Sequence, residues 1–271
     1  VRFGNYNQRN YINICYQLAR IRSSRHKRPN ERSCANGLRT NFVQQGAKTM
    51  KTILITGSSR GIGKAIARIF AKHGWNIVLN YNHSEQKAIT LANDLGKYAN
   101  VLCVKADVGN NAELNDLYRL AREKFGKIDA VVNNAGVTVE KMLVDMTFGE
   151  IRSVVDTNLV GTINSCRLAL NQFDGEGTIV NISSCQGEIG ASCEAVYAST
   201  KAGISCLSRS LIDEYADTSV RIFDLPLGWV DTDMTARYTK AEKQEFLSAN
   251  PQFKAQTKTQ VAKTIYDLIT K

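Results

Sequence analysis

The stretch "TGSSRGIGKAIA", residues Thr56 to Ala67, joins a short apolar run to an amphipathic one. Its glycines, Gly57, Gly61 and Gly63, stand where a tight turn must bring the backbone close to a ligand. The β-branched residues before the turn and the helical pattern after it form the strand–turn–helix context of a dinucleotide-binding loop. The amino end of such a helix presents N–H groups and a positive dipole to a pyrophosphate.

Two other interpretations of these glycines can be compared with the residues around them. A phosphate-binding loop of the nucleotide triphosphatase type ends in Gly-Lys-Ser/Thr, but Lys64 is followed by Ala65. That interpretation is therefore excluded. The glycines could also serve only a tight turn between a strand and a helix, and this alternative stays open.

Around this loop, short apolar runs alternate with longer amphipathic runs, as strands alternate with helices in βαβ units. Thr147 and Glu150 have the spacing of a capping box at the start of the fourth helix. We expect one α/β domain, a Rossmann-type doubly wound parallel sheet that binds ligands at the carboxyl ends of its strands. The expected strands are 52–56, 76–81, 101–106, 130–133, 178–183 and 220–225. The expected helices are 62–73, 84–97, 111–125, 147–173 and 195–215.

The charge of the chain is concentrated at its front. The 271 residues carry a net charge of +10, and residues 1–49 hold ten basic side chains against the single acid Glu31. This segment could be an organelle transit peptide, a nucleic-acid-binding tail, or upstream sequence that is not part of the native protein, with Met50 as the true start. We expect residues 1–49 to be a disordered basic extension and residues 50–271 to be the functional domain.

Composition excludes several classes of protein. No apolar run approaches the ~18 residues that a membrane-spanning helix needs, so no membrane contact is expected. The seven cysteines form no C-x-x-C pair and show no zinc-type spacing, so we expect no metal site. An odd number of cysteines in a chain of this size predicts reduced thiols in a cytoplasmic protein.

Residues after the next strands indicate which dinucleotide binds. The second strand ends at the neutral Asn80, where an acidic residue would favour NAD, and Arg60 in the glycine loop could pair with a 2′-phosphate. Both features predict NADPH in preference to NADH, although Arg60 could be a plain surface charge. Asp107 could accept a hydrogen bond from the adenine amino group or cap a helix. The small residues of "NNAG", with Asn134, Ala135 and Gly136, would let the cofactor cross the sheet edge.

Together, "TGSSRGIG", "NNAG", a serine after the fifth strand and Y-x-x-x-K resemble the short-chain dehydrogenase/reductase superfamily over most of residues 50–235. The general likeness is to bacterial 3-oxoacyl-carrier-protein reductases. The resemblance implies hydride transfer between NADP(H) and a ketone, and a homo-oligomer, either dimer or tetramer. It also implies further cofactor contacts, from Ser59, Ile62, Val108, Gly228, Val230 and Thr232.

The resemblance assigns catalytic roles to four residues. Tyr197 would protonate the carbonyl oxygen, and Lys201, one helical turn on, would stabilise the tyrosinate and bind the nicotinamide ribose. Ser184 would donate a hydrogen bond to the substrate oxygen, with Ser183 as the alternative if the register differs by one. Asn158 would hold a water molecule that links Lys201 to solvent, or stabilise a helix kink.

The sequence departs from the family pattern in two places. After the sixth strand, Leu227 stands where proline is usual and Phe223 where asparagine is usual, so an altered loop is expected there. The chain ends at "VAKTIYDLITK", which reads as the family's last helix without the seventh strand and glycine-rich segment that usually follow. Six parallel strands are therefore predicted.

Substrate identity depends on "GASCEAVY", residues Gly190 to Tyr197. This run resembles a bacterial subgroup that reduces 5-aminopentanone carried on elongation factor P. Cys193 and Glu194 would then line the substrate pocket, with Glu194 attracting a cationic amino group; alternatively, Glu194 is a helix-start carboxylate and Cys193 a packing residue. The expected ketone is carried on a protein, either acyl carrier protein or elongation factor P.

Two non-enzymatic functions are alternatives. A nucleotide-sensing regulator on the same fold would be expected to lose Tyr197 or Lys201, and both are present. A nucleic-acid binder would have to use the basic residues 1–49, because the remainder of the chain is close to neutral. We therefore expect no nucleic-acid partner for residues 50–271.

Overall fold

A computed structural model describes residues 50–271, so the predictions made for residues 1–49 lie outside the described residues. Six parallel strands form one sheet in the order β3-β2-β1-β4-β5-β6. The expected Rossmann-type doubly wound sheet of six strands is confirmed. The strands are β1 (Thr52–Ile55), β2 (Asn76–Tyr81), β3 (Val101–Lys105), β4 (Ala130–Asn133), β5 (Glu176–Ser184) and β6 (Ser219–Leu227).

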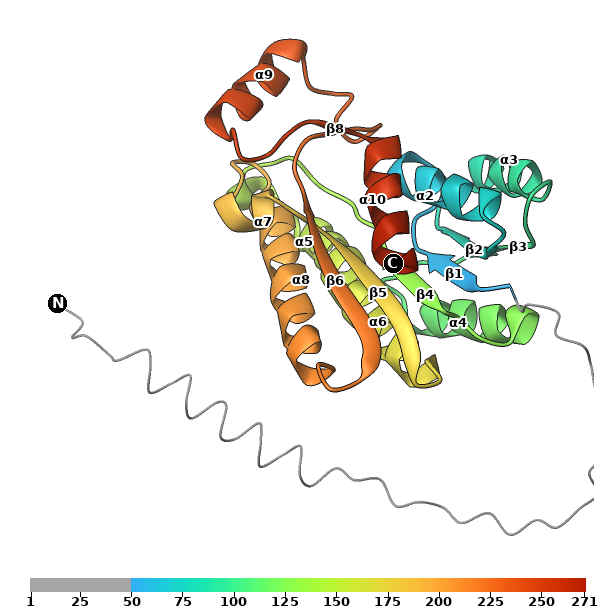
Figure 1. Cartoon of the computed structure of the whole chain (residues 1–271). Coiled ribbons are helices and arrows are strands. Elements are labelled where there is room, and N and C mark those ends of the chain that lie inside the picture. The colour runs from blue at the N-terminus through green and yellow to red at the C-terminus, as the bar shows by residue number, and fades with distance from the viewer. Residues whose placement is uncertain (1–49) are drawn as a thin grey trace, which may run out of the picture. The chain divides into compact units, whose positions relative to one another are not determined.

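The central strands are apolar on both faces because helices cover both sides of the sheet. In β1, Ile53 and Ile55 belong to one hydrophobic core and Leu54 to the other, as the two-residue period of a strand requires. Helices α2 (Gly61–Lys72), α3 (Glu85–Leu95) and α10 (Lys258–Thr270) pack on the first side. Helices α4 (Asn111–Phe125), α6 (Gly161–Gln172) and α8 (Ala195–Glu214) cover the second (Figure 1).

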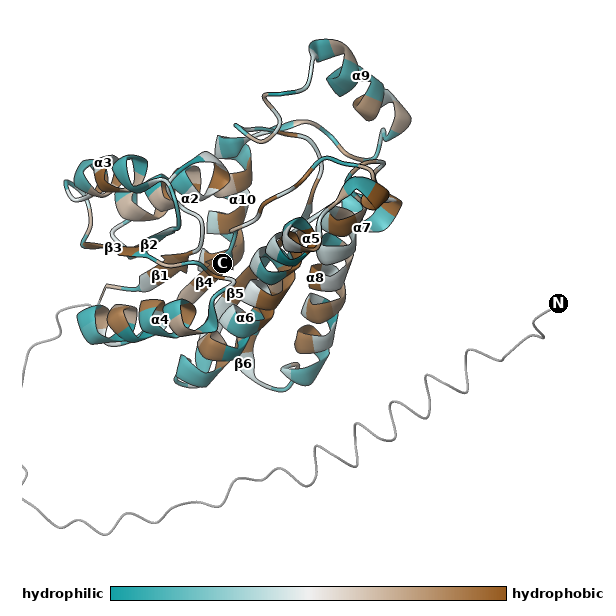
Figure 2. Cartoon of the chain, turned by 180° about the vertical axis from the view of Figure 1, so that it is seen from behind, coloured by the Kyte–Doolittle hydropathy of each residue, from teal (hydrophilic) through white to brown (hydrophobic). Residues whose placement is uncertain are grey.

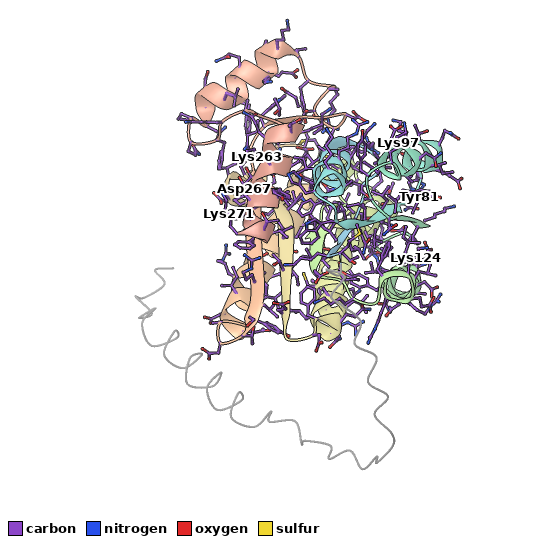
Figure 3. The ribbon with its side chains drawn as sticks, turned by 45° about the vertical axis from the view of Figure 1, so that its right-hand side comes forward. Tyr81, Lys97, Lys124, Lys263, Asp267 and Lys271 are labelled. Atoms are coloured by element: carbon purple, nitrogen blue, oxygen red, sulfur yellow. The ribbon has the colours of Figure 1, made fainter. Side chains whose placement is uncertain are left out.

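Hydropathy follows the same layers. Figure 2 shows brown strands in the middle of the body and teal on the outer surfaces of α3 and α4. The outer face of α10 carries Lys263, Asp267 and Lys271 in a row (Figure 3). Asp267 pairs with Lys263 at 3.1 Å and with Lys271 at 3.8 Å. Exposed pairs of this kind contribute little stability, so the buried face of α10 is what holds it to α2.

The helix expected over residues 147–173 is interrupted, and the expectation of one continuous helix was wrong. It divides into α5 (Phe148–Val155), a π-helical turn, η2 (Asp156–Val160), and α6. The Thr147–Glu150 capping box is confirmed at its start. The π turn lies against the loop that follows β3, since a Cβ on Gly161 would come within 2.9 Å of the Val108 carbonyl oxygen. A wider turn at this point places Asn158 inside the molecule, where it is fully buried.

The altered stretch after the sixth expected strand is accommodated at a sheet edge. Pro226 lies within β6, opposite Ser183 of β5, and β6 is the last strand of the sheet. Proline cannot donate a ladder hydrogen bond, so an edge strand is the place where it is tolerated. The sequence departure therefore leaves the strand intact, and the chain leaves β6 at Gly228.

Short elements that the sequence pattern did not predict lie beyond the strand ends. The chain ends with the expected helix, α10, which begins with a capping box formed by Thr257 and Gln260. A search of the helices in residues 50–271 finds none with the length and apolarity that a bilayer crossing requires. The short elements that the sequence pattern did not predict are η1 (Leu143–Asp145), α7 (Gln186–Ile189), β7 (Val230–Asp231), α9 (Lys240–Ala249) and β8 (Gln256–Thr257).

The close contact of Gly161 with the loop after β3 leads to a stability prediction. Gly161→Ala should lower the free energy of unfolding by about 1–3 kcal/mol, because the added methyl group meets backbone atoms of Val108 that cannot move aside. Urea unfolding measures this change. Gly149→Ala is the matched control. Gly149 is an exposed glycine of α5 where a Cβ would lie 4.0 Å from its nearest neighbour, so alanine should stabilise by about 0.5–1 kcal/mol. Equal effects of the two substitutions would contradict the prediction.

Candidate active site

A cleft of about 600 Å³ lies at the carboxyl ends of the strands. It extends from the glycine loop after β1 to the start of α8, and crosses the point between β1 and β4 where the strand order reverses. Three predicted site residues, Gly63, Asn158 and Cys193, do not line it. The predicted residues that line it are Gly57, Ser59, Arg60, Gly61, Ile62, Asn80, Asp107, Val108, Asn134, Ala135, Gly136, Ser184, Glu194, Tyr197, Lys201, Gly228, Val230 and Thr232.

The glycine loop needs its glycines for two different reasons. Gly57 and Gly61 have φ of 61° and 58°, in the left-handed region that other residues rarely adopt. Gly63 has an ordinary conformation but no room, since a Cβ there would come within 2.8 Å of the Gly57 carbonyl oxygen. Gly63 therefore brings the first turn of α2 against the loop without lining the cleft itself.

Asn80 has a structural task at the end of β2. Its Oδ1 accepts a hydrogen bond from the Gly57 N–H at 3.0 Å, and its Nδ2 donates to the Ala106 carbonyl at 2.9 Å. The side chain thus ties the glycine loop to the strands on both sides. Asn134 does the same from the end of β4, where its Nδ2 donates to the Thr56 carbonyl at 2.8 Å.

The two charged residues expected near the adenosine end differ in their surroundings. Arg60 is exposed, and its guanidinium lies 3.6 Å from the Asp233 carboxylate. Asp107 Oδ1 accepts a hydrogen bond from the Gly109 N–H at 2.9 Å, which supports the turn before α4. The cap of α4 itself is Asn110, whose side chain accepts hydrogen bonds from Ala112 and Glu113. Arg60 and Asp107 both line the cleft.

Tyr197 and Lys201 lie on the first turns of α8, on the face directed toward the cleft. The Lys201 ammonium is 5.6 Å from the centre of the Tyr197 ring, and it donates a hydrogen bond to the Ile182 carbonyl at 2.7 Å. Ser184, the last residue of β5, lines the same part of the cleft. The fold therefore brings the predicted phenol, ammonium and hydroxyl groups together from a helix and the neighbouring strand.

Burial changes the acidity of this pair. Removal from water raises the pKa of Tyr197 to about 12, with the hydrogen bond to Ser184 opposing the rise and the Glu194 charge adding to it. Burial lowers the pKa of Lys201 to about 8, and the charge of Asp224 opposes this fall. A buried ammonium with a weakened hold on its proton is typical of functional sites.

Asn158 lies behind the cleft rather than in it. Its Oδ1 accepts a hydrogen bond from the Val137 N–H at 2.8 Å, and its Nδ2 donates to the Val137 carbonyl at 2.9 Å. A Cβ on Gly136 would lie 3.5 Å from Asn158 Oδ1 and 3.8 Å from Lys201 Nζ, so Gly136 separates the two side chains. The π turn and the chain after β4 are held together by this amide, as the kink interpretation expected.

Cys193 and Glu194, the two residues expected to contact the substrate, differ in their placement: Glu194 lines the cleft and Cys193 does not. Cys193 lies outside the cleft lining, with its sulfur 3.7 Å from that of Met142. It has a φ of 59°, and it is the only non-glycine residue of the described chain with a positive φ. The Glu194 side chain is only 7% exposed and its carboxylate is paired with Arg237 at 3.0 Å. The Arg237 guanidinium therefore offsets the charge of this carboxylate, and its role toward a substrate stays a prediction.

The sequence pattern missed much of the substrate side of the cleft. The lining residues that were missed do not belong to a recurrent motif. Arg237 and Tyr238 follow β7, in a segment without helical or strand periodicity. Their contact with the cleft depends on how that segment returns over the strand ends. The missed lining residues on this side include Glu140, Ser153, Thr157, Gln186, Trp229 and Arg237.

Comparison with known proteins agrees with this geometry. Residues 51–243 match the pattern of the family described as short chain dehydrogenase. The chain belongs to the short chain dehydrogenase family. It is 33% identical over 221 residues to the 3-oxoacyl-(acyl-carrier-protein) reductase FabG of Staphylococcus aureus, which covers 80% of this chain and 90% of that protein. The same-named reductase of Chlamydia muridarum is 35% identical, over 78% of this chain and 87% of that protein.

Solved structures of this family show the same architecture. A short chain dehydrogenase from Burkholderia cenocepacia in complex with NADP superposes with a TM-score of 0.75 at 26% identity, over 82% of this chain and 91% of that one. A 3-ketoacyl-(acyl-carrier-protein) reductase from Brucella melitensis complexed with NADH gives a TM-score of 0.73 at 26% identity, over 81% and 90%. The chain is thus an oxidoreductase of the short chain dehydrogenase family.

The lowered pKa of Lys201 has a measurable effect on stability. Folded Lys201 releases its proton near pH 8, whereas an unfolded lysine holds its proton up to about pH 10.5. Stability rises with pH wherever the unfolded state binds more protons. The free energy of unfolding of the parent, relative to Lys201→Met, should therefore rise between pH 8 and 10.5. Urea unfolding of both proteins across this range measures the difference, and a difference that stays flat or falls would contradict the assignment.

Proposed function

We propose that this chain reduces a ketone to a secondary alcohol, using NADPH as the hydride donor and Tyr197 as the proton donor. The observation that carries the proposal is the meeting of Tyr197, Lys201 and Ser184 at one end of a cleft whose other end is the glycine loop. In this arrangement a dinucleotide on the loop would reach the phenol. The dimer or tetramer and the cytoplasmic location stay predictions.

The residues present fit a nicotinamide dinucleotide. Gly57 and Gly61 line the cleft with backbone that carries no side chain, and at Gly61 nothing lies within 4 Å of the position that a Cβ would take. Ser183 Oγ is buried and has no hydrogen-bond partner within residues 50–271, although Ser183 lines the cleft. A polar group in that position is available to a ligand. When bound, the cofactor supplies the hydride.

The preference for NADPH rests on charge. Arg60 would bind the 2′-phosphate, with a guanidinium whose N–H groups match phosphate oxygens. The cleft residues that follow β2, from Asn82 to Ser84, include no carboxylate that would repel this phosphate. Two solved relatives, one in complex with NADP and the other with NADH, support dinucleotide binding in general. Arg60 and the absent carboxylate support the phosphorylated form.

Each catalytic side chain has a separate task in the proposed reaction. Tyr197 donates its phenolic proton to the carbonyl oxygen of the ketone, and Ser184 donates a second hydrogen bond to that oxygen as negative charge develops. The Lys201 ammonium lies close enough to the ring to stabilise the tyrosinate that is left. Asn158 acts behind them by holding the backbone at Val137, and it would hold the water that returns a proton to Lys201.

The proposed substrate is a 3-oxoacyl group carried on acyl carrier protein. The relatives with 31–35% identity carry the name of this reductase. The cleft has a mixed polar and apolar wall on its substrate side, with Trp229 and Phe246 as well as Ser153 and Thr157. A short acyl chain with a ketone at its third carbon would contact both kinds of side chain.

A ketone with a cationic amino group, such as 5-aminopentanone on elongation factor P, is the second candidate. One observation favours it: three carboxylates, Glu140, Glu194 and Glu242, line this side of the cleft, together with the basic side chains of Arg237 and the buried Lys201. Glu194 and Glu140 are both paired with Arg237, at 3.0 and 3.2 Å, so any attraction would come chiefly from Glu242, which is exposed. An acidic entrance would concentrate a cationic substrate.

The proton-donor role predicts how removal of the Tyr197 hydroxyl group changes the reaction rate. Tyr197→Phe should lower kcat by at least about 10²–10⁴, because it removes the general acid. The dissociation constant for NADPH, measured by fluorescence titration, should change by less than about threefold, a difference within about 0.7 kcal/mol. Activity equal to that of the parent would refute the mechanism. Loss of cofactor binding would show that the substitution had damaged the cleft.

The two substrate candidates separate in a direct comparison. NADPH oxidation is measured with a 3-oxoacyl thioester on acyl carrier protein and with 5-aminopentanonylated elongation factor P. We expect a higher kcat/KM for the thioester. A higher value for the translation factor, together with its loss in Glu242→Gln, would favour the second candidate. Tyr197→Phe serves as the inactive control for both substrates.

A further inference from the structure

The Glu194 carboxylate is the centre of a buried polar cluster beside the catalytic helix. Thr138 Oγ1 and Arg237 Nη2 donate hydrogen bonds to Glu194 Oε1, at 2.7 and 3.0 Å. Gln186 Nε2 donates to Oε2 at 2.7 Å. Each carboxylate oxygen therefore accepts at least one hydrogen bond from the protein.

The donors come from three separate parts of the fold. Thr138 follows β4, Gln186 begins α7, and Arg237 lies in the segment after β7. Glu194 itself is the residue immediately before α8, three positions from Tyr197. One carboxylate thus joins three segments that surround the reacting end of the cleft to the catalytic helix.

The backbone before Glu194 is held in an unusual conformation. Cys193 has a φ of 59°, which costs about 1–3 kcal/mol for a residue with a side chain. Its carbonyl accepts a hydrogen bond from the Lys141 N–H at 2.8 Å. This turn places Glu194 inside the cluster, so the chain tolerates local strain in order to bury this carboxylate.

Arg237 extends the cluster over the cleft. Its Nε lies 3.2 Å from Glu140 Oε2, and its guanidinium stacks on the Tyr238 ring at 4.9 Å. Tyr238 in turn contacts Trp229, with ring centres 5.6 Å apart. Arg237, Tyr238 and Trp229 all line the cleft. The segment from Thr232 to Tyr238 is therefore attached to the catalytic helix mainly through the Arg237–Glu194 pair.

Burying a carboxylate is costly unless its partners compensate for the lost water, and an uncharged residue of similar size would avoid that cost. The three protein donors compensate part of this cost and fix the orientation of the carboxylate. A charged group oriented in this way is suited to holding the Arg237 guanidinium in one position.

We propose that Glu194 is a positioning residue that fastens the segment Thr232–Tyr238 to the first turn of α8, so that the wall binding the ketone and the proton donor Tyr197 are held in one fixed arrangement. Arg237 is its partner. The kinetic consequences rest on the proposed reductase function, whereas the attachment of the segment does not.

The charge of Glu194 also predicts how the pH dependence of the reduction rate should change when Glu194 or Arg237 is replaced. Tyr197 faces Ser184, Cys185, Glu194, Lys201 and Tyr238, and among these Glu194 contributes a negative charge that raises the pKa of the phenol. Arg237 offsets that charge. Loss of Glu194 should therefore move the alkaline limb of the reduction rate to lower pH, and loss of Arg237 should move it to higher pH. A purely structural role would shift both variants alike.

The first test is a double-mutant cycle on the full chain with Glu194→Gln, Arg237→Met and the combination. Each single variant should raise KM for the ketone about tenfold, or about 1.4 kcal/mol, with a much smaller change in kcat. Because the contact between Glu194 and Arg237 is lost in either single variant, the two effects should not add, and the double variant should be about tenfold worse rather than a hundredfold. Arg237→Lys keeps the charge but not the planar fork, and it should restore part of the loss. Additive effects would overturn the proposal.

The second test needs no substrate. Hydrogen–deuterium exchange should speed up in residues 232–238 of Glu194→Gln and Arg237→Met, while the amides of β1, β4 and β5 keep the protection of the parent. Arg119→Met is the control, since it breaks an exposed arginine pair with Asp116 and Glu123 on α4 and should alter neither exchange nor KM. Unchanged exchange in 232–238 would overturn the proposal. A parent without activity on any ketone would refute the proposed function, yet the exchange result would still decide the attachment.

Discussion

The close approach of two backbones at the centre of the sheet is the constraint on which the rest of this structure depends. The turn after β1 passes so near the turn after β4 that Gly57 has no room for a Cβ beside Ala135. Thr56 Oγ1 accepts hydrogen bonds from the N–H groups of Asn134 and Ala135, each at 3.0 Å, and joins the two turns. The cleft begins where these turns meet, since parallel strands on either side of a switch point send their connections to opposite faces.

Buried charge is the second organising feature. Lys201 is 4% exposed and Glu194 is 6% exposed, and both lie within about a turn of Tyr197 on the sequence. Their roles differ because their partners differ. Lys201 has one carbonyl partner and keeps its ammonium close to the phenol, whereas Glu194 uses both oxygens on protein donors. The first is suited to proton chemistry and the second to holding the wall of the cleft.

The elements with regular patterns were predictable from sequence, and the reasons are local. The strand over Asn76–Tyr81 and the helix over Asn111–Phe125 have the predicted bounds, because apolar periodicity and caps act within a few residues. The prediction of one continuous helix over residues 147–173 was wrong. The π turn at Asp156–Val160 interrupts the helix where it packs against Val108, which lies some fifty positions away in sequence. No periodicity within the helix records that contact.

The sheet, the glycine loop and the placement of Tyr197 and Lys201 on one helix could be predicted from sequence, since each depends on neighbours along the chain or on a motif of fixed spacing. The proposed task of Glu194 could be inferred only from the folded chain. In sequence it is a carboxylate at a helix start, equally suited to a substrate cation or a helix dipole. Its donors, Thr138, Gln186 and Arg237, come from three segments up to 56 positions away. Whether a carboxylate is free or fully bonded depends on which side chains the fold brings to it, and those long-range contacts leave no local pattern.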